Sequence, residues 1–190
     1  MIKAILFDCF GVLTTEAWLP FKAKYFGHDP ELYEQVSRLS WQADIGKLDY
    51  DELLRQTAKL AHISPQQARQ EIFRHVPDKE LFAYITELKK HYKIGLLSNI
   101  VGGYLEQVFT DGQLEQFDNQ ALSFEIGFRK PQPEAYVIAA QQLGLEPAEC
   151  VLIDDQEHNV AGAHAAGMQA LLYHDAARLK QDLPELLQAA

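Results

Sequence analysis

Short runs of apolar residues recur along the chain, and each is followed directly by polar residues or glycine. The runs predict β-strands at 3–8, 94–97, 120–124, 150–153 and 170–173. Between them, apolar residues recur at the three-to-four-residue spacing of helices that bury one face. Such helices are expected at 78–91, 102–109, 133–143 and 159–166. Strands that alternate with helices predict an α/β fold, here a Rossmann-like doubly wound parallel sheet with helices on both faces.

One long stretch breaks this alternation. Residues 16–76 contain no apolar run like those of the strands, but their aromatic and aliphatic residues have helical spacing. A crossover between two parallel strands does not need about 60 residues, so the excess is expected to fold as a small lid. We therefore predict a core made of 1–15 and 78–190 and an α-helical cap inserted at 16–77.

The composition narrows the classes of partner. The 190 residues are 47% hydrophobic and 23% charged, which is typical of globular proteins. The chain has 17 Lys and Arg against 27 Asp and Glu, and the net charge of −10 argues against nucleic acid and anionic membranes as partners. No apolar run reaches the roughly 18 residues of a membrane helix, and Asp8 interrupts the apolar run near the N-terminus, so no signal peptide is expected. We expect a cytoplasmic protein that acts on a small molecule, and the sequence predicts no particular oligomeric state.

Polar side chains stand at the C-terminal ends of three predicted strands. Asp8 follows the first strand, Ser98 and Asn99 follow the second, and Asp154 and Asp155 follow a later one. Ligands of open parallel sheets bind at the carboxyl ends of the strands, so these side chains are expected to meet at one site. Two adjacent carboxylates after a buried strand repel each other unless a cation lies between them. The pattern therefore indicates a site that holds a cation.

Several other residues need an interpretation before they are assigned to that site. Lys130 precedes Pro131, which restricts the backbone of Lys130. We assign Lys130 to the candidate site because it lies, in chain order, between Ser98 and the pair Asp154 and Asp155. Its neighbour Arg129 has no such support and is interpreted as a surface residue. His75 follows a helical segment and is also expected at the surface. Cys9 is interpreted as a small buried residue rather than a nucleophile, because no histidine nearby in sequence could activate it.

Together, these residues resemble the haloacid dehalogenase-like hydrolase superfamily. The matching motifs are Asp8-x-x-Gly11-x-Leu13-Thr14, Leu97-Ser98-Asn99, Arg129-Lys130-Pro131-x-Pro133-x-x-Tyr136 and Ile153-Asp154-Asp155-x-x-x-Asn159-x-x-Gly162-Ala163. The inserted helical segment resembles the branch of the superfamily whose helical cap follows the first motif, so the resemblance covers nearly the whole chain. Most members are Mg²⁺-dependent phosphatases, which implies a Mg²⁺ cofactor and a small phosphorylated substrate.

The resemblance implies a role for each carboxylate. Asp8 would attack the phosphoryl group and form an aspartyl-phosphate. The Asp8 carboxylate and the phosphate of the substrate are both anions and repel each other, so Mg²⁺ would lie between them. Mg²⁺ prefers oxygen ligands. The implied ligands are Asp8, Asp155 and the backbone carbonyl of Phe10, while Asp154 is either a further ligand or holds a metal-bound water.

The resemblance also implies how the substrate would be held. The hydroxyl of Ser98 and the backbone N–H groups of the following turn would bind a phosphate oxygen, and Asn99 would help to orient the group. Lys130 would bridge the nucleophile and the phosphoryl oxygens and stabilise the charge that develops during transfer. The predicted catalytic residues are therefore Asp8, Ser98 and Lys130, and the predicted substrate-binding residues are Ser98, Asn99 and Lys130.

Phe10 departs from the family pattern. Phosphatases of this superfamily usually carry a second aspartate at this position, which protonates the leaving alcohol and then activates water. An aromatic ring cannot move protons, and three interpretations follow. The protein is a phosphatase for substrates with good leaving groups, such as sugar 1-phosphates, or one that takes its proton carrier from the cap; members similar to α-glucose-1-phosphate phosphatase also lack this acid. It is a 2-haloacid dehalogenase, because halide leaves unprotonated. Or it is a binding protein with a weak or silent site.

The paired acids favour the phosphatase over the dehalogenase. Dehalogenation needs no Mg²⁺, and dehalogenases lack the pair seen at Asp154 and Asp155. A dehalogenase would also need an arginine from the cap near the first motif. The cap arginines Arg38, Arg55 and Arg69 stand in no such motif.

Overall fold

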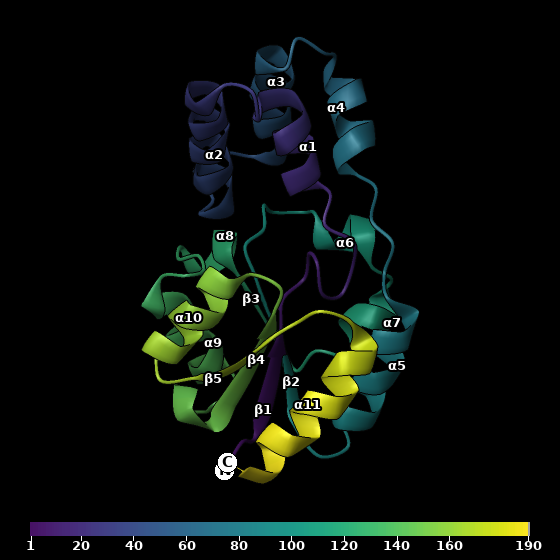
Figure 1. The fold of residues 1–190 in the computed structure, drawn as a ribbon, viewed down its shortest axis with the longest axis vertical. Helices are drawn as coiled ribbons and strands as arrows, with labels where there is room; N and C mark the ends of the chain where they lie inside the picture. The colour runs from purple at the N-terminus through teal and green to yellow at the C-terminus, as the bar shows by residue number, and fades with distance from the viewer. Residues whose placement is uncertain (190) are drawn as a thin grey trace.

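The computed structural model describes residues 1–189, and its centre is a five-stranded parallel sheet (Figure 1). The strand order is β3-β2-β1-β4-β5, so the first strand lies in the middle and the chain winds outward in both directions. The strands are β1 (Ala4–Phe7), β2 (Lys93–Ser98), β3 (Asn119–Leu122), β4 (Cys150–Asp154) and β5 (Gln169–Leu172). All five predicted strands are present within one or two residues of the expected ends, which confirms the α/β fold.

Helices cover both faces of the sheet and close two separate apolar layers. On one face lie α5 (Lys79–Leu88), α6 (Leu105–Val108), α7 (Asp111–Leu114) and α11 (Ala176–Ala189). On the other face lie α9 (Pro133–Gln142) and α10 (Glu157–Ala165), while α8 (Ser123–Ile126) follows β3 and the 3₁₀ turn η1 (Pro147–Glu149) precedes β4. Large aliphatic and aromatic residues fill the first layer, whereas the second layer packs small alanines of α9 and α10 closely against the sheet.

Four helices form a separate layer above the C-terminal edge of the sheet (Figure 1). They are α1 (Trp18–Phe26), α2 (Pro30–Asp44), α3 (Tyr50–Leu60) and α4 (Pro65–Ile72). Side chains of Asp29, Asp49 and Ser64 cap α2, α3 and α4 by accepting hydrogen bonds from first-turn N–H groups. The layer has its own buried cluster, which includes Phe26, Val36 and Ala58. We call the helices α1–α4 the cap.

The differences between expectation and structure lie in short or irregular helices. The helix expected at 102–109 is reduced to the single turn α6, because Gly103 adopts a left-handed φ of 74° just before it. The turns α7 and α8 and the C-terminal helix α11 were not predicted. No helix within residues 1–189 combines the length and hydrophobicity needed to cross a bilayer.

Candidate active site

The ends of β1, β2 and β4 bring the predicted site residues to one place. The register pairs Phe7 with Leu96 and with Ile153, so Asp8 follows directly beside Asp154, and Ser98 stands two residues after Leu96 at the same edge. The backbone N–H of Asp8 donates to the Ile153 carbonyl at 2.9 Å, which fixes the position of Asp8 beside the end of β4. Parallel strands therefore place a carboxylate from β1 next to the carboxylates after β4, as the alternation of strands and helices predicted.

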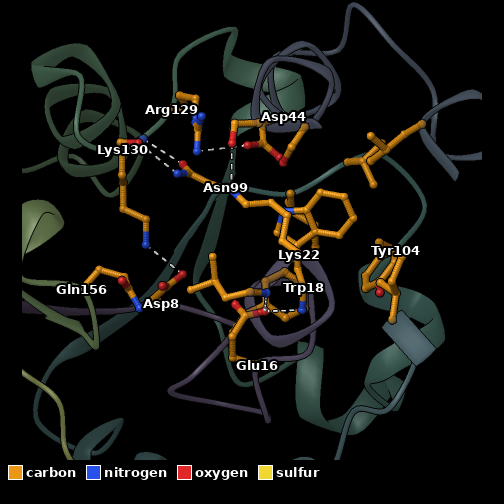
Figure 2. Close-up of a pocket in the computed structure, with 18 of the residues that line it drawn as sticks. Asp8, Glu16, Trp18, Lys22, Asp44, Asn99, Tyr104, Arg129, Lys130 and Gln156 are labelled. Atoms are coloured by element: carbon orange, nitrogen blue, oxygen red, sulfur yellow. Dashed lines mark hydrogen bonds and ion pairs between the residues drawn. The ribbon is translucent and has the colours of Figure 1, made fainter. Parts of the chain in front are cut away.

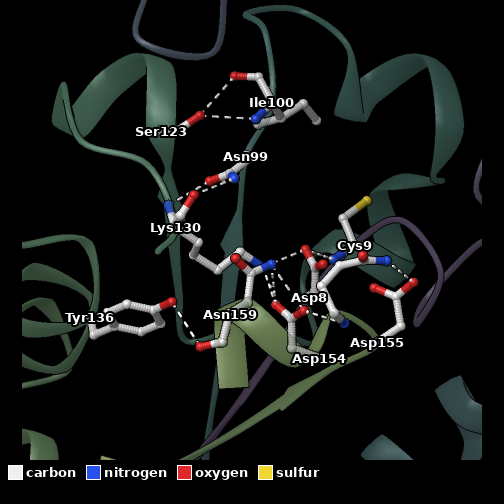
Figure 3. Close-up of polar contacts among 11 residues, drawn as sticks. Asp8, Cys9, Asn99, Ile100, Ser123, Lys130, Tyr136, Asp154, Asp155 and Asn159 are labelled. Carbon is white, nitrogen blue, oxygen red and sulfur yellow. Dashed lines mark hydrogen bonds and ion pairs between the residues drawn. The ribbon is translucent and has the colours of Figure 1, made fainter. Parts of the chain in front are cut away.

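Three carboxylates form a compact cluster at this edge. Ligand atoms of Asp8, Asp154 and Asp155 all lie within 4.8 Å of one another (Figure 3). Asp8 and Asp154 are buried, and Asp155 is partly buried. Burial raises the pKa of Asp8, because a charged carboxylate loses its hydration there, and Lys130 only partly opposes this. The three carboxylates can therefore be ionised together only if a cation compensates their charge.

Lys130 supplies one positive charge to the cluster. Its Nζ lies 2.8 Å from Asp8 Oδ1 and 2.5 Å from Asp154 Oδ2, and its side chain is 1% exposed. Burial alone would lower the pKa of Lys130, but the two carboxylates outweigh burial and raise it. Burial likewise opposes ionisation of Asp154, yet Lys130 holds its pKa below the usual range. Lys130 is therefore a fixed cation between the predicted nucleophile and Asp154.

The carboxylate oxygens of Asp154 and Asp155 differ in their hydrogen-bond partners. Asp154 Oδ1 accepts hydrogen bonds from Gln156 N at 2.9 Å and Asn159 Nδ2 at 3.0 Å, and Oδ2 faces Lys130. Asp155 Oδ1, in contrast, is buried without a hydrogen-bond partner among residues 1–189. An unpaired buried carboxylate oxygen beside Asp8 fits a divalent cation. Asp155 is thus placed to act as a ligand, while Asp154 is occupied by protein donors.

Gly11 makes the approach of Asp155 possible. Its φ is +84°, a left-handed conformation that favours glycine. A Cβ atom at this position would collide with the Asp155 carboxylate, so the turn after β1 has to pass Asp155 without a side chain.

Ser98 and Asn99 end β2 in different environments. Ser98 is fully buried, and within the described chain its Oγ has no hydrogen-bond partner, which fits a hydroxyl that awaits an oxygen of a ligand. The Asn99 side chain forms two hydrogen bonds with the Lys130 backbone: Nδ2 donates to the carbonyl at 2.9 Å and Oδ1 accepts from N–H at 2.8 Å (Figure 3). Asn99 therefore positions the lysine loop, a role that the sequence did not indicate.

A cavity of about 330 Å³ opens from this cluster toward the cap (Figure 2). Its lining includes Asp8, Asn99, Lys130 and Asp155 from the core and side chains of α1, α2 and α3 from the cap. Much of the wall is apolar or aromatic. The wall residues of this kind are Phe10, Trp18, Leu19, Tyr50, Leu53, Leu54, Ile72, Ile100, Val101 and Tyr104. The volume lies at the lower end of the range for small-molecule sites.

Phe10 belongs to an aromatic group in this wall. Its ring lies 5.2 Å from that of His75 and 5.8 Å from that of Tyr104, measured between centroids. The imidazole of His75 is hydrogen-bonded on both sides, to Tyr104 Oη at 2.9 Å and to the Thr15 carbonyl at 3.0 Å. His75 was expected at the surface, but it lies in the cavity wall, because the chain that leaves the cap runs back beside the first turn.

Arg129 was also expected at the surface, and the structure corrects this. Its Nη2 lies 3.2 Å from Asp44 Oδ2 at the end of α2, and its side chain is 27% exposed. Burial raises the pKa of Asp44 to about 6, against the opposing charges of Arg129 and Lys22. Lys22 of α1 lines the same cavity. The one sequence signal that could have found Lys22 is its position on α1, one turn from Trp18 and one turn from Phe26 on a helix rich in aromatic residues.

Comparison with known proteins identifies the family of this chain and proteins that are similar to it. A family model described as haloacid dehalogenase-like hydrolase matches residues 2–167. YhcW of Bacillus subtilis (strain 168), whose name marks it as a provisional phosphatase, is 30% identical over 196 aligned residues. That alignment covers 90% of this chain and 83% of YhcW.

Solved structures share the fold. An enzyme of the same family from Bacteroides thetaiotaomicron, determined in complex with magnesium and inorganic phosphate, has a TM-score of 0.74 at 24% identity, with 94% of this chain and 99% of that chain covered. L-2-haloacid dehalogenase from Xanthobacter autotrophicus has a TM-score of 0.66 at 21% identity, with 97% and 83% covered. At these identities both similarities establish the architecture alone.

Proposed function

The chain belongs to the haloacid dehalogenase-like hydrolase family, and from that premise we propose that it is a Mg²⁺-dependent phosphatase of a small phosphorylated metabolite. The observation that carries the proposal is the cluster of Asp8, Asp154 and Asp155 within 4.8 Å, in which Lys130 pairs with Asp8 and Asp154, at the base of the cavity beneath the cap. The phosphatase name of YhcW supports the same reaction class.

Asp8 would be the nucleophile. Both contacts to its carboxylate, from Cys9 N at 2.6 Å and from Lys130 Nζ at 2.8 Å, go to Oδ1, which leaves Oδ2 for the substrate. Attack of Oδ2 on phosphorus would form an aspartyl-phosphate as the bond to the leaving oxygen breaks, and that oxygen would leave as an anion and take its proton from solvent. Water would then hydrolyse the acyl phosphate to inorganic phosphate and the free Asp8 carboxylate. Lys130 would hold Asp8 in place and neutralise charge on the phosphoryl oxygens, and Ser98 Oγ would donate to one of them.

The residues at the edge of the sheet fit a magnesium ion. Asp8 and Asp155 would hold it together with the Phe10 carbonyl, as the resemblance implies, and Asp154 would support the site through Lys130 and Asn159. When bound, the ion would reduce the repulsion between the carboxylate and the phosphate. The magnesium and phosphate in the Bacteroides enzyme support this choice of cofactor.

The cavity gives less support to a dehalogenase. That alternative needs an arginine from the cap near the first motif, but the arginine in the cavity wall is Arg129 of the core, which is paired with Asp44. The paired acids Asp154 and Asp155 also have no use in a reaction that proceeds without metal. No observation therefore favours a second function.

The proposal is tested by the hydrolysis of 4-nitrophenyl phosphate with and without Mg²⁺. The wild type should release nitrophenol in Mg²⁺ and lose at least about 100-fold in rate in EDTA, since electrostatic stabilisation of the transferred group is a large part of such catalysis. Asp8→Asn should remove turnover and the acid-labile phosphoenzyme while it keeps the fold, and Asp111→Asn, at an exposed position, should behave as wild type. Retained turnover in Asp8→Asn would exclude Asp8 as the nucleophile.

A further inference from the structure

The end of the cavity beneath α1 and α2 contains more positive than negative charge. Lys22 of α1 and Arg129 of the core both line it, and Asp44 of α2 is the carboxylate that faces them (Figure 2). In Figure 2, Arg129 and Asp44 lie together above Asp8, so this charged group is separate from the carboxylate cluster.

Lys22 is a buried cation whose donors are only partly used. The residue is 8% exposed, and its Nζ donates to Ser37 Oγ at 2.9 Å and lies 4.1 Å from the centre of the Tyr33 ring. Within residues 1–189, no carboxylate lies within 4.0 Å of this ammonium. An ammonium has three donors, and burying its charge is costly unless an anion or several acceptors compensate. The hydroxyl and the ring compensate only in part.

Arg129 also has donor capacity to spare. Its Nη2 is used by Asp44, but its Nε is buried and has no hydrogen-bond partner in the described chain. A guanidinium presents its donors as a planar fork that suits carboxylate and phosphate oxygens. Buried polar groups without partners are rare and usually mark a missing ligand or water.

We propose that Lys22 and Arg129 bind a second anionic group of the substrate, which makes the substrate a small phosphomonoester that also carries a carboxylate or a second phosphate. This rests on the proposed phosphatase function, since it places the phosphoryl group at Asp8 and the second anion at the cap. Two cations against one carboxylate leave room for one more negative charge, and the aromatic and aliphatic wall between the two ends would contact the carbon skeleton. The cavity of about 330 Å³ suits a metabolite of that size.

Two matched aryl phosphates test the charge requirement. 4-Carboxyphenyl phosphate carries a carboxylate across the ring from the phosphate, whereas 4-carbamoylphenyl phosphate has a similar shape and a comparable phenol leaving group but no second charge. We expect the wild type to favour the carboxylate by about 10–100-fold in kcat/KM, mostly through KM, as is typical of hydrogen bonds to charged groups. 1,4-Phenylene bisphosphate, compared with the carboxylate ester, shows which anion the subsite prefers.

Lys22→Met removes the charge and keeps much of the side-chain length. In this variant the preference for the carboxylate ester should fall toward one. Lys24→Met is the matched control, because Lys24 lies on the same helix but is 59% exposed and paired with Glu71; it should keep the preference. The comparison of the two esters on the wild type needs no variant and decides the question even if Lys22→Met does not fold.

The possible results distinguish a failure of the proposed anion subsite from a failure of the proposed phosphatase activity. Hydrolysis of both esters with equal kcat/KM, or a preference that survives Lys22→Met, would overturn the subsite and leave the phosphatase intact. If neither ester is hydrolysed, the affinities of the two esters for Asp8→Asn are measured by calorimetry. Tighter binding of the carboxylate ester would support the subsite even though the protein is not a phosphatase. Equal affinities would overturn the subsite.

Discussion

Phe10 stands where the resemblance to the family predicts a second aspartate. Its ring is half-buried against His75 and Tyr104, so it is part of the cavity wall and has no means of moving a proton. General acid–base help typically contributes about 10²–10⁴ in rate, and its absence should make turnover depend steeply on the basicity of the leaving group. Aryl and anomeric phosphates should react, and simple alkyl phosphates hardly at all.

Phe10→Asp tests this dependence directly. The new carboxylate would stand where the family pattern expects an acid, and alkyl phosphate turnover should rise by up to about 10²–10⁴ while aryl phosphates change little. Because Phe10 is half-buried, the loss of stability should be below the roughly 3–5 kcal/mol of a fully buried phenylalanine. Rates for a series of esters with different leaving groups measure the effect.

Phe10→Asn is the matched control, since it has nearly the same size as the aspartate but cannot transfer a proton. If the two variants behave alike across the series, the proton comes from another group. Glu16 lines the same cavity, and burial raises its pKa, although N–H groups at the start of α1 oppose the rise. Its position could not be predicted, because Glu16 precedes α1 and sequence spacing does not say how the chain that enters the cap faces the site.

At the scale of elements, the pair formed by Asp44 and Arg129 links α2 of the cap to the loop that carries Lys130. Burial raises the pKa of Asp44 to about 6, whereas an unfolded aspartate titrates near about 3.9. Between about pH 4 and pH 6, Asp44 therefore keeps a proton in the folded protein that it has released in the unfolded chain. The stability that this proton contributes is complete below about pH 4 and is lost as the pH rises through 6.

The wild type should therefore lose about 1 kcal/mol of stability relative to Asp44→Asn between pH 5 and pH 7. Urea unfolding of both proteins in metal-free buffer at several pH values measures the difference. Asp51→Asn, at an exposed position of α3, should run parallel to the wild type over the whole range. A constant difference between wild type and Asp44→Asn would mean that Asp44 ionises normally in the folded protein.

The elements also show what the sequence could predict. The strands were predictable because each is a short apolar run that stops at a polar residue, and the ends of β1, β2 and β4 placed Asp8, Ser98 and Asp154 correctly at one edge. The pairing of Arg129 with Asp44 was not predictable, because it depends on how the cap packs against the core. Local patterns determine where a strand ends, but not which helix side meets a distant loop.

At the scale of the whole molecule, the proposed metal site would join the two halves of the sheet. Asp8 leaves the central strand and Asp155 follows β4, so a cation between them would tie the first turn to the later part of the core. The same cation would relieve the repulsion within the carboxylate cluster. The stability of the fold should therefore depend on Mg²⁺.

We expect Mg²⁺ at about 100 times its dissociation constant to add about 2.7 kcal/mol, because the ion binds only the folded state. For a chain of 190 residues this corresponds to a rise in melting temperature of roughly 5–10 °C.

Asp155→Asn should lose most of the rise, because it replaces the oxygen that has no protein partner. Asp154→Asn should lose less of it, since Asp154 is already bonded to Lys130 and Asn159, but it should lower the melting temperature in the absence of metal. Differential scanning fluorimetry with Mg²⁺, and with Na⁺ at matched ionic strength, separates metal binding from screening of the net charge of −10. Equal melting temperatures for the wild type in the two salts would count against a resident magnesium ion, and with it against phosphoryl transfer at Asp8.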